Sequence, residues 1–173
     1  MLDGLAAHRE TTGAFLSDFT LALIAAAHGR AGQWDEALRY VDEGLELVEQ
    51  TLERLYVAEL WRVKGELLAA RARSKPRRGS AADRATEAAV GCVRRALGIA
   101  REQEARSLEL RAATSLARLL AQREERDQAL EILRAVYATF REGFDTRDLQ
   151  DARALLATGP PAAGRAASER SKP

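Results

Sequence analysis

The chain has 173 residues, of which 46% are hydrophobic and 31% are charged, and its 27 basic and 26 acidic side chains leave a formal net charge of +1. This balance gives no reason to expect nucleic acid or an anionic membrane as the main partner. Two histidines, one cysteine and 12 glycines leave little material for an active site. We therefore expect no enzymatic activity, no catalytic residue, no cofactor and no metal ion.

The N-terminal segment and the single cysteine bear on localisation. The first ten residues, MLDGLAAHRE, lack the basic start and apolar stretch of a signal peptide. The longest apolar run, around residues 21–27, is far too short to span a bilayer. Cys92 has no second cysteine with which to form an internal disulfide, which fits a reducing compartment. These features predict a cytoplasmic protein without membrane association.

Almost every stretch of the chain predicts helix, because Ala, Leu, Glu and Arg dominate and no alternating β-branched run indicates a strand. Gly32 follows the first long helical stretch, where a glycine can adopt positive φ. Thr146 is the expected N-cap of the last helix, with Asp148 in its acidic first turn. We expect helices at about residues 14–30, 34–50, 53–72, 82–103, 106–122, 126–141 and 146–157, and a further short helix at about 2–9.

Two segments have a different composition. Residues 71–80, RARSKPRRGS, are basic and contain Pro76 and Gly79, so a loop is predicted at about 71–81. Residues 158–173 are small, polar and proline-containing. They offer too little apolar surface to offset the entropy of ordering, which predicts a disordered tail. The predicted helical domain therefore covers residues 1–157.

Small residues recur at related positions of successive helices, at spacings that put them on one helical face. The distance from Ala25 to Gly65 is about 40 positions, and the distance from Ala89 to Ala129 is again about 40. Small side chains at such positions permit close helix approach, and the larger side chains beside them fill the remaining space. The first helices of the pairs contribute Ala25, Gly65 and Ala117, and the second helices contribute Ala37, Ala89 and Ala129, with Val41, Val93 and Leu133 as the larger residues.

This pattern of small and large residues resembles that of tetratricopeptide repeats (TPRs). The spacing of about 40 is longer than their standard length of about 34 residues, and the excess indicates helices extended by a turn or two. The stretch AGQWDEALRYVDEGLEL (31–47) is the best single match to that motif. We therefore expect an all-α, TPR-like right-handed solenoid of about three antiparallel helix pairs with a C-terminal capping helix at 146–157. An unrelated helical bundle and a HEAT-like array, whose period is also near 40, remain alternatives.

Three longer stretches carry a closer resemblance. They are AELWRVKGELLAA (58–70), RRALGIAREQEARSLELRAATSLARLL (94–120) and GFDTRDLQDARALL (143–156). Together they resemble the C-terminal TPR region of large bacterial regulators. In that family a class III adenylate or guanylate cyclase domain, or a DNA-binding domain, precedes an AAA-type ATPase domain and then the repeats.

The resemblance implies a regulatory, partner-binding region and not cyclase or ATPase chemistry. The sequence contains no G-x4-G-K-[ST] phosphate loop and no Asp-rich metal site on a predicted strand. Members of the family usually have glycine in the turns where this chain has Leu52 and Glu104. The resemblance covers about residues 3–157 and excludes the tail.

The first helix of each TPR pair lines a concave groove, and grooves of this kind bind peptides. Three arginines on the predicted groove face would be able to converge on a partner's carboxylate by bidentate pairing. A solvated face with local ion pairs, such as Arg62 with Glu66, is the favoured alternative. The predicted groove residues are Glu59, Arg62, Glu66, Arg111, Thr114 and Arg118.

The remaining candidates favour structural roles. The basic segment 71–78 would be able to contact phosphate, but it lacks aromatic residues for stacking on nucleic-acid bases, so a solvated insertion is favoured. His28 is expected to pack against the next helix, and Cys92 to be a buried or half-buried structural thiol. Trp34 and Trp61 are expected to be packing residues.

We therefore expect a non-catalytic protein–protein interaction module that binds a peptide or a neighbouring domain, such as a cyclase or ATPase domain, in its groove. An orphan structural fragment of such a regulator, with no partner of its own, is one alternative. A weak nucleic-acid-associated regulator acting through the basic loop is another, although a nucleic-acid partner is not favoured. Homo-oligomerisation through a terminal helix is compatible with the sequence.

Overall fold

The computed structural model describes residues 17–51, 54–74, 80–121 and 123–159, and all regular secondary structure within these ranges is α-helical. The predicted all-α class is confirmed, and the predicted helix bounds agree within four residues. The short helix predicted at 2–9 lies outside the described residues. The helices are α2 (Ser17–Arg30), α3 (Trp34–Thr51), α4 (Val57–Ser74), α5 (Ser80–Glu102), α6 (Arg106–Leu119), α7 (Arg126–Tyr137) and α8 (Arg147–Ala157).

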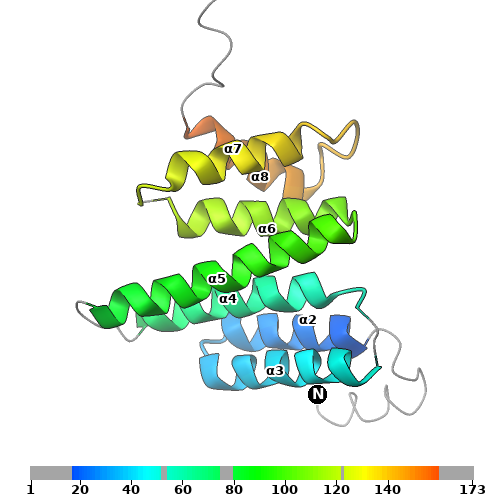
Figure 1. Ribbon diagram of the computed structural model, residues 1–173, viewed down its shortest axis with the longest axis vertical. Coiled ribbons are helices and arrows are strands. Elements are labelled where there is room, and N and C mark those ends of the chain that lie inside the picture. The colour runs from blue at the N-terminus through cyan, green and yellow to red at the C-terminus, as the bar shows by residue number, and fades with distance from the viewer. Residues whose placement is uncertain (1–16, 52–53, 75–79, 122, 160–173) are drawn as a thin grey trace, which may run out of the picture.

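The helix pairs follow one another in chain order along the long axis of the molecule, from α2 and α3 at one end to α7 and α8 at the other (Figure 1). Each helix packs against the next one in the sequence, and α5 crosses in front of α4 while α7 lies in front of α8 (Figure 1). The even-numbered helices also contact one another in succession, α2 with α4, α4 with α6 and α6 with α8. The described parts of α3, α5 and α7 make no comparable contacts with one another. The even-numbered helices thus form a continuous row, and the six predicted groove residues lie on two helices of this row, α4 and α6.

Local sequence signals explain where two of the helices begin and end. Gly32 has a φ of +75° just after α2, in the left-handed region that favours glycine. Thr146 has the extended backbone of an N-cap before α8 (φ −68°, ψ 146°), as predicted. Its hydroxyl does not cap the helix but donates to the carbonyl oxygen of Gly143 at 2.7 Å. Glu104 has a φ of 53°, at one of the turns where glycine was expected from the family resemblance.

The small residues of the predicted repeats lie at the helix crossings. Ala25, Ala37 and Ala89 are completely buried, and Ala117 and Ala129 nearly so. Gly65 shows an approach that includes backbone: a Cβ at this position would lie 2.5 Å from Val93 Cγ2 and 2.7 Å from the Ala89 carbonyl oxygen. Because real Cβ atoms essentially never show such distances, α4 and α5 can pack this closely only with glycine at position 65.

The buried side chains form two apolar clusters. One is built from α2, α3 and α4, and the other from α5, α6, α7 and α8. Trp61 packs against both clusters, so the predicted packing role of this residue is confirmed. Trp34 packs against the first cluster. His28 also packs as predicted, with its ring centroid 5.1 Å from that of Tyr40 on α3.

The boundaries predicted for the basic loop need correction. Helix α4 continues to Ser74 and α5 already begins at Ser80, so residues 71–74 and 80–81 are helical, and 75–79 lie outside the described residues. No helix breaker precedes Pro76, and the basic residues Arg71 and Arg73 in the last turn of α4 suit the negative end of the helix dipole.

The first residues of the predicted tail are also part of the packed structure. The Thr158 carbonyl oxygen accepts a hydrogen bond from Arg126 Nη2 at 2.5 Å. A Cβ at Gly159 would meet Leu130 Cδ1 of α7 at 2.6 Å. Residues 160–173, the rest of the predicted tail, lie outside the described part.

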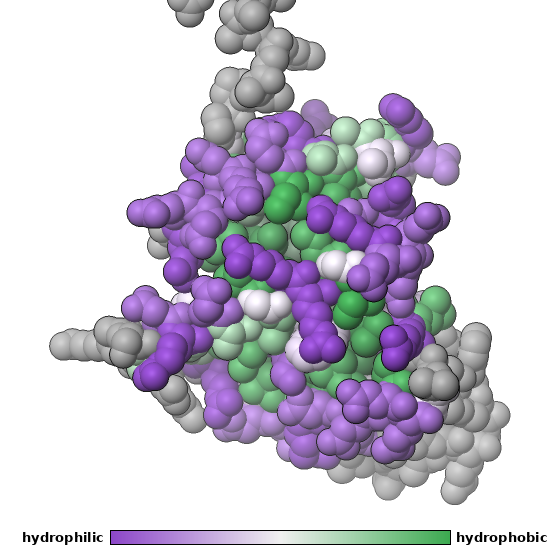
Figure 2. Space-filling model, viewed as in Figure 1, coloured by the Kyte–Doolittle hydropathy of each residue, from purple (hydrophilic) through white to green (hydrophobic). Residues whose placement is uncertain are grey.

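The surface formed by the odd-numbered helices shows apolar seams between polar ridges (Figure 2). The large apolar side chains most exposed on the described part of the molecule are Leu23, Leu55 and Phe144. None of the described helices is long and apolar enough to cross a membrane.

Candidate functional site

Charged side chains from three even-numbered helices meet along the row α4, α6 and α8. We call this set the α4–α6–α8 network. It contains five of the six predicted groove residues and three residues that were not predicted as part of the site. The network consists of Glu59, Arg62 and Glu66 on α4, Arg111, Ser115 and Arg118 on α6, and Asp148 and Asp151 on α8.

The α4–α6 part of the network is centred on the buried carboxylate of Glu59, which is 7% exposed. Arg62 donates to it in a bidentate fork, Nε to Oε2 at 2.9 Å and Nη2 to Oε1 at 2.7 Å. Arg111 Nη1 lies 3.5 Å from the same Oε1. Two of the three predicted arginines therefore converge on a carboxylate, but that carboxylate belongs to the chain itself.

Arg62 also bonds toward the second carboxylate of α4. Its Nη1 lies 2.7 Å from Glu66 Oε1, which confirms the ion pair expected at a spacing of four residues. Ser115 of α6 donates to the same oxygen at 2.6 Å and accepts a longer hydrogen bond from Arg62 at 3.4 Å. The side chains of α4 and α6 are thus joined by hydrogen bonds and ion pairs within the chain.

These contacts determine the ionisation of Glu59 and Arg62. Burial by itself would raise the pKa of Glu59, but the hydrogen bonds from Arg62 and the charges of Arg62 and Arg111 outweigh it, so the pKa lies below its ordinary value. Burial would likewise lower the pKa of Arg62, but its contacts with Glu59 and Glu66 outweigh this effect and raise the pKa. Both groups are charged at neutral pH.

The α6–α8 part of the network is more exposed. Arg111 Nε donates to Asp148 Oδ2 at 2.7 Å, and Arg118 Nη2 donates to Asp151 Oδ2 at 2.8 Å. The four side chains are about two-fifths exposed: 40% and 39% for the first pair, 46% and 41% for the second. Two of the three arginines that were predicted to hold a partner's carboxylate, Arg111 and Arg118, are therefore paired with carboxylates of α8.

Thr114 departs most from the predicted groove position. It is 5% exposed and not groove-lining, because α6 is packed against α4, α5, α7 and α8 and has few exposed positions. Its Oγ1 is the buried side-chain oxygen that finds no hydrogen-bond partner within the described part of the chain. Glu59 is buried for the same kind of reason, since α4 is covered by α2, α3, α5 and α6.

The sequence analysis missed Ser115, Asp148 and Asp151 as members of the site. Asp148 and Asp151 are three residues apart on α8 and so share a helical face. Arg111 and Arg118, seven residues apart, share a face of α6. This match of spacing and charge was visible in the sequence, but nothing in it showed that the two faces are opposed.

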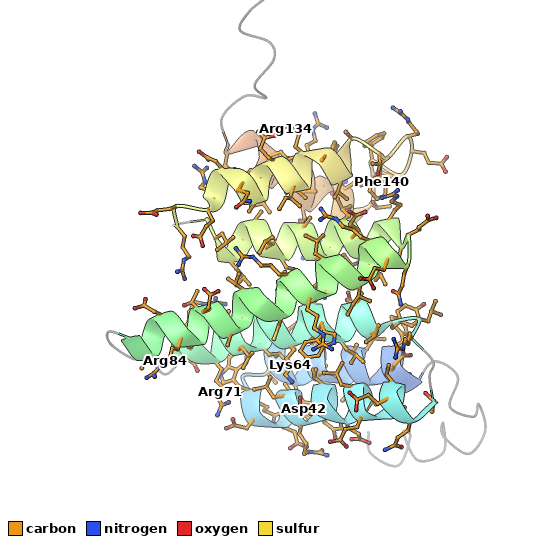
Figure 3. All side chains as sticks on the ribbon, viewed as in Figure 1. Asp42, Lys64, Arg71, Arg84, Arg134 and Phe140 are labelled. Carbon is orange, nitrogen blue, oxygen red and sulfur yellow. The ribbon has the colours of Figure 1, made fainter. Side chains whose placement is uncertain are left out.

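A second polar feature lies on the opposite side of the molecule. An open groove of about 680 Å³ runs between α3 and α4, on the side where Asp42, Lys64 and Arg71 are seen in Figure 3. Lys64 is paired with Asp42 at 2.7 Å, and Arg71 with Asp35 at 2.8 Å. Arg71, a member of the predicted basic segment, is therefore already bound to a carboxylate. The groove is lined by Asp35, Leu38, Arg39, Asp42, Glu43, Glu46, Lys64, Leu68 and Arg71.

Cys92 on α5 is half-buried, and burial raises the pKa of its thiol. The position agrees with the predicted structural role, since a raised pKa disfavours the reactive thiolate. In the described ranges, no group of three or more His, Cys, Asp or Glu side chains is arranged to hold a metal ion.

Comparisons of the chain with protein-family descriptions, with curated proteins and with solved structures found no match. The candidate site is therefore defined by its geometry alone. It consists of a buried α4–α6 cluster beside an exposed row of arginine–aspartate pairs between α6 and α8.

Proposed function

We propose that the chain is a non-catalytic interaction module, a TPR-like solenoid that binds a peptide or a neighbouring domain along its even-numbered helices. One observation carries this proposal: α2, α4, α6 and α8 contact one another in succession, and the described odd-numbered helices make no comparable contacts with one another. This is the packing pattern that a right-handed stack of antiparallel helix pairs would give, with the first helices lining one face.

The chemistry of that face favours a partner with carboxylates. Arg111 and Arg118 keep 40% and 46% of their side chains exposed while each already holds an aspartate. Guanidinium groups have more donors than one carboxylate uses, so the same arginines are able to bind further acidic groups. The resemblance to the repeat region of cyclase–ATPase regulators supports a signalling partner, such as a cyclase or ATPase domain.

The proposal is tested by capture from the native lysate on the immobilised chain, followed by calorimetric titration of the recovered partner. We expect the Arg111→Ala/Arg118→Ala variant to lose about 1.5–3 kcal/mol of binding free energy for each charged hydrogen bond that becomes buried on binding. The matched control is Arg84→Ala/Arg94→Ala, which removes two exposed arginines from α5, a helix outside the even-numbered row. If the recovered partner bound the Arg111→Ala/Arg118→Ala variant and the control variant with equal affinity, the result would contradict a binding site on the even-numbered helices.

A further inference from the structure

Helix α8 is the least anchored helix of the described part of the chain. It has 11 residues, the fewest of the seven described helices, and only two of its side chains, Leu149 and Ala152, are buried. The connection from α7, residues 138–146, is the longest between consecutive described helices, and most of its residues are exposed. Elements with few buried contacts and long connections open at the lowest free energies.

The ionic contacts that hold α8 on α6 are readily exchanged. Both arginine–aspartate pairs are about two-fifths exposed, and exposed pairs of this kind contribute little to stability, because water screens them and replaces their hydrogen bonds. Carboxylates from another molecule would make the same contacts. The arginines of α6 therefore favour an acidic helix on this surface without strongly selecting α8 itself.

The face of α6 that contacts α8 also contains an unsatisfied group. Thr114 lies three residues from Arg111 and four from Arg118, on the face of α6 that bears the two contacts with α8. Its buried Oγ1 finds no hydrogen-bond partner among the described residues. A buried hydroxyl without a partner costs free energy in the folded chain, and α8, which contacts Arg111 and Arg118 on the same face of α6, does not supply that partner.

We propose that α8 is a displaceable internal ligand, and that an acidic amphipathic helix of a partner protein docks on α6 and α7 in its place. Such a helix would reproduce the pattern of α8: carboxylates at positions i and i+3, as at Asp148 and Asp151, and apolar residues at i+1 and i+4, as at Leu149 and Ala152. This inference rests on the proposed function, because it specifies the partner's chemistry at the same row of helices.

The test uses the full chain and a fluorescent peptide of residues 144–159, which carries the α8 pattern. In the full chain, Asp148→Asn/Asp151→Asn weakens the internal helix and leaves the surface of α6 unchanged. We expect this variant to bind the peptide about 2- to 30-fold more tightly than the wild-type chain, the range that two exposed ion pairs would give. The arginines are kept in this test because their replacement would weaken internal and external docking together.

Two controls make the result specific to the paired carboxylates. The chain variant Glu142→Gln/Asp145→Asn removes the same charge from the exposed connection, and we expect it to bind the peptide like the wild-type chain. A peptide with asparagine in place of both aspartates should bind more weakly than the acidic peptide by a similar factor of about 2 to 30. Equal peptide binding by the two chain variants, or no binding to either, would overturn the proposal.

Native-state hydrogen exchange supplies a second measurement that needs no peptide. We expect the amides of α8 to exchange through an opening that leaves those of α6 protected, whereas equal protection of both helices would show that α8 is a fixed part of the fold. Concentration-dependent dimerisation with exchanged α8 helices would assign the surface to a second copy and overturn the role of a partner protein. If the peptide fails to bind while a captured protein still depends on Arg111 and Arg118, the further inference fails and the proposed function stands.

Discussion

The α4–α6–α8 network has a buried junction, formed by its side chains on α4 and α6 around Glu59, and an exposed junction, formed by the arginine–aspartate pairs of α6 and α8. The two junctions use the same chemistry in different surroundings. The Arg62–Glu59 contact and the Arg118–Asp151 contact have nearly equal closest distances, 2.7 and 2.8 Å. Arg62 and Glu59 expose 15% and 9% of their side chains, however, whereas Arg118 and Asp151 expose 46% and 41%. A short distance therefore does not measure the importance of an ion pair, because the free energy of breaking it depends on whether water can replace the lost partner.

The largest expected effect comes from removing one arginine at each junction. Arg62→Met leaves Glu59 buried with only the longer contact to Arg111, and we expect it to lower the free energy of unfolding by about 3–5 kcal/mol. Arg118→Met is the matched change at the exposed junction and should cost less than about 1 kcal/mol. Urea denaturation monitored by circular dichroism measures both. Similar losses for the two variants would contradict the comparison.

A packing substitution gives a scale for these ionic effects. Gly65→Ala places a methyl group against Val93 and the Ala89 carbonyl oxygen, and should destabilise the fold by about 1–3 kcal/mol through overpacking. Gly91 on α5 has open space where a methyl group would stand, with no atom within 4 Å, so Gly91→Ala should instead stabilise the helix by up to about 1 kcal/mol. Thermal midpoints of the two variants should move in opposite directions. A lower midpoint for both would show that Gly65 is not a special position.

The buried junction should also make stability depend on acid. Because the pKa of Glu59 is lower in the folded chain than its ordinary value of 4.5, its contribution to stability is fully present above about pH 4.5 and is lost as the pH falls through the folded-state pKa. Glu59→Gln should therefore reduce the loss of stability below pH 4.5. Denaturation series across this range measure the slope, with Glu142→Gln as a control for the removed charge. An unchanged slope in Glu59→Gln would assign the acid sensitivity to other carboxylates.

The smallest expected effect concerns the buried hydroxyl of Thr114, which lies on α6 beside the network. Thr114→Val keeps the shape of the side chain and removes the buried Oγ1, and should stabilise the fold by up to about 1 kcal/mol. Its neighbour Ser115 donates to Glu66 at 2.6 Å, so Ser115→Ala should destabilise by about 1 kcal/mol. Opposite signs in chemical denaturation would confirm that the two hydroxyls differ in hydrogen bonding. Destabilisation by Thr114→Val would indicate a partner for its hydroxyl.

The helices and most of the core were predictable because their signals are local. A spacing of three, four or seven residues places side chains on one helical face whatever surrounds the helix. The expected burial of Ala25, Ala89 and Leu133 is confirmed for this reason. The helix breakers Gly32 and Pro76 likewise indicated where α2 and α4 end. The basic composition of residues 71–74, however, led to the wrong prediction that the loop begins within the last turn of α4.

The candidate site was predictable only in part. Sequence spacing identified Arg62 and Glu66 as a local pair on one helix, and their contact is confirmed. It did not show that Glu59 and Thr114 would be buried, because the face opposite one packing stripe becomes a second packing face when a helix is covered on several sides. Exposure at such positions depends on neighbours that are distant in the chain.

The sequence by itself determined that this protein is helical, where its described helices lie and which small residues permit their close approach. Only the tertiary structure decided the partners of the arginines. Arg111 contacts Glu59, which is 52 residues away, and Asp148, which is 37 residues away. The sequence offers 26 acidic residues, and their charge alone does not distinguish one from another. The choice among them is made by the packing of α4 and α8 against α6, because a Coulomb interaction acts on whichever opposite charge the fold brings within reach.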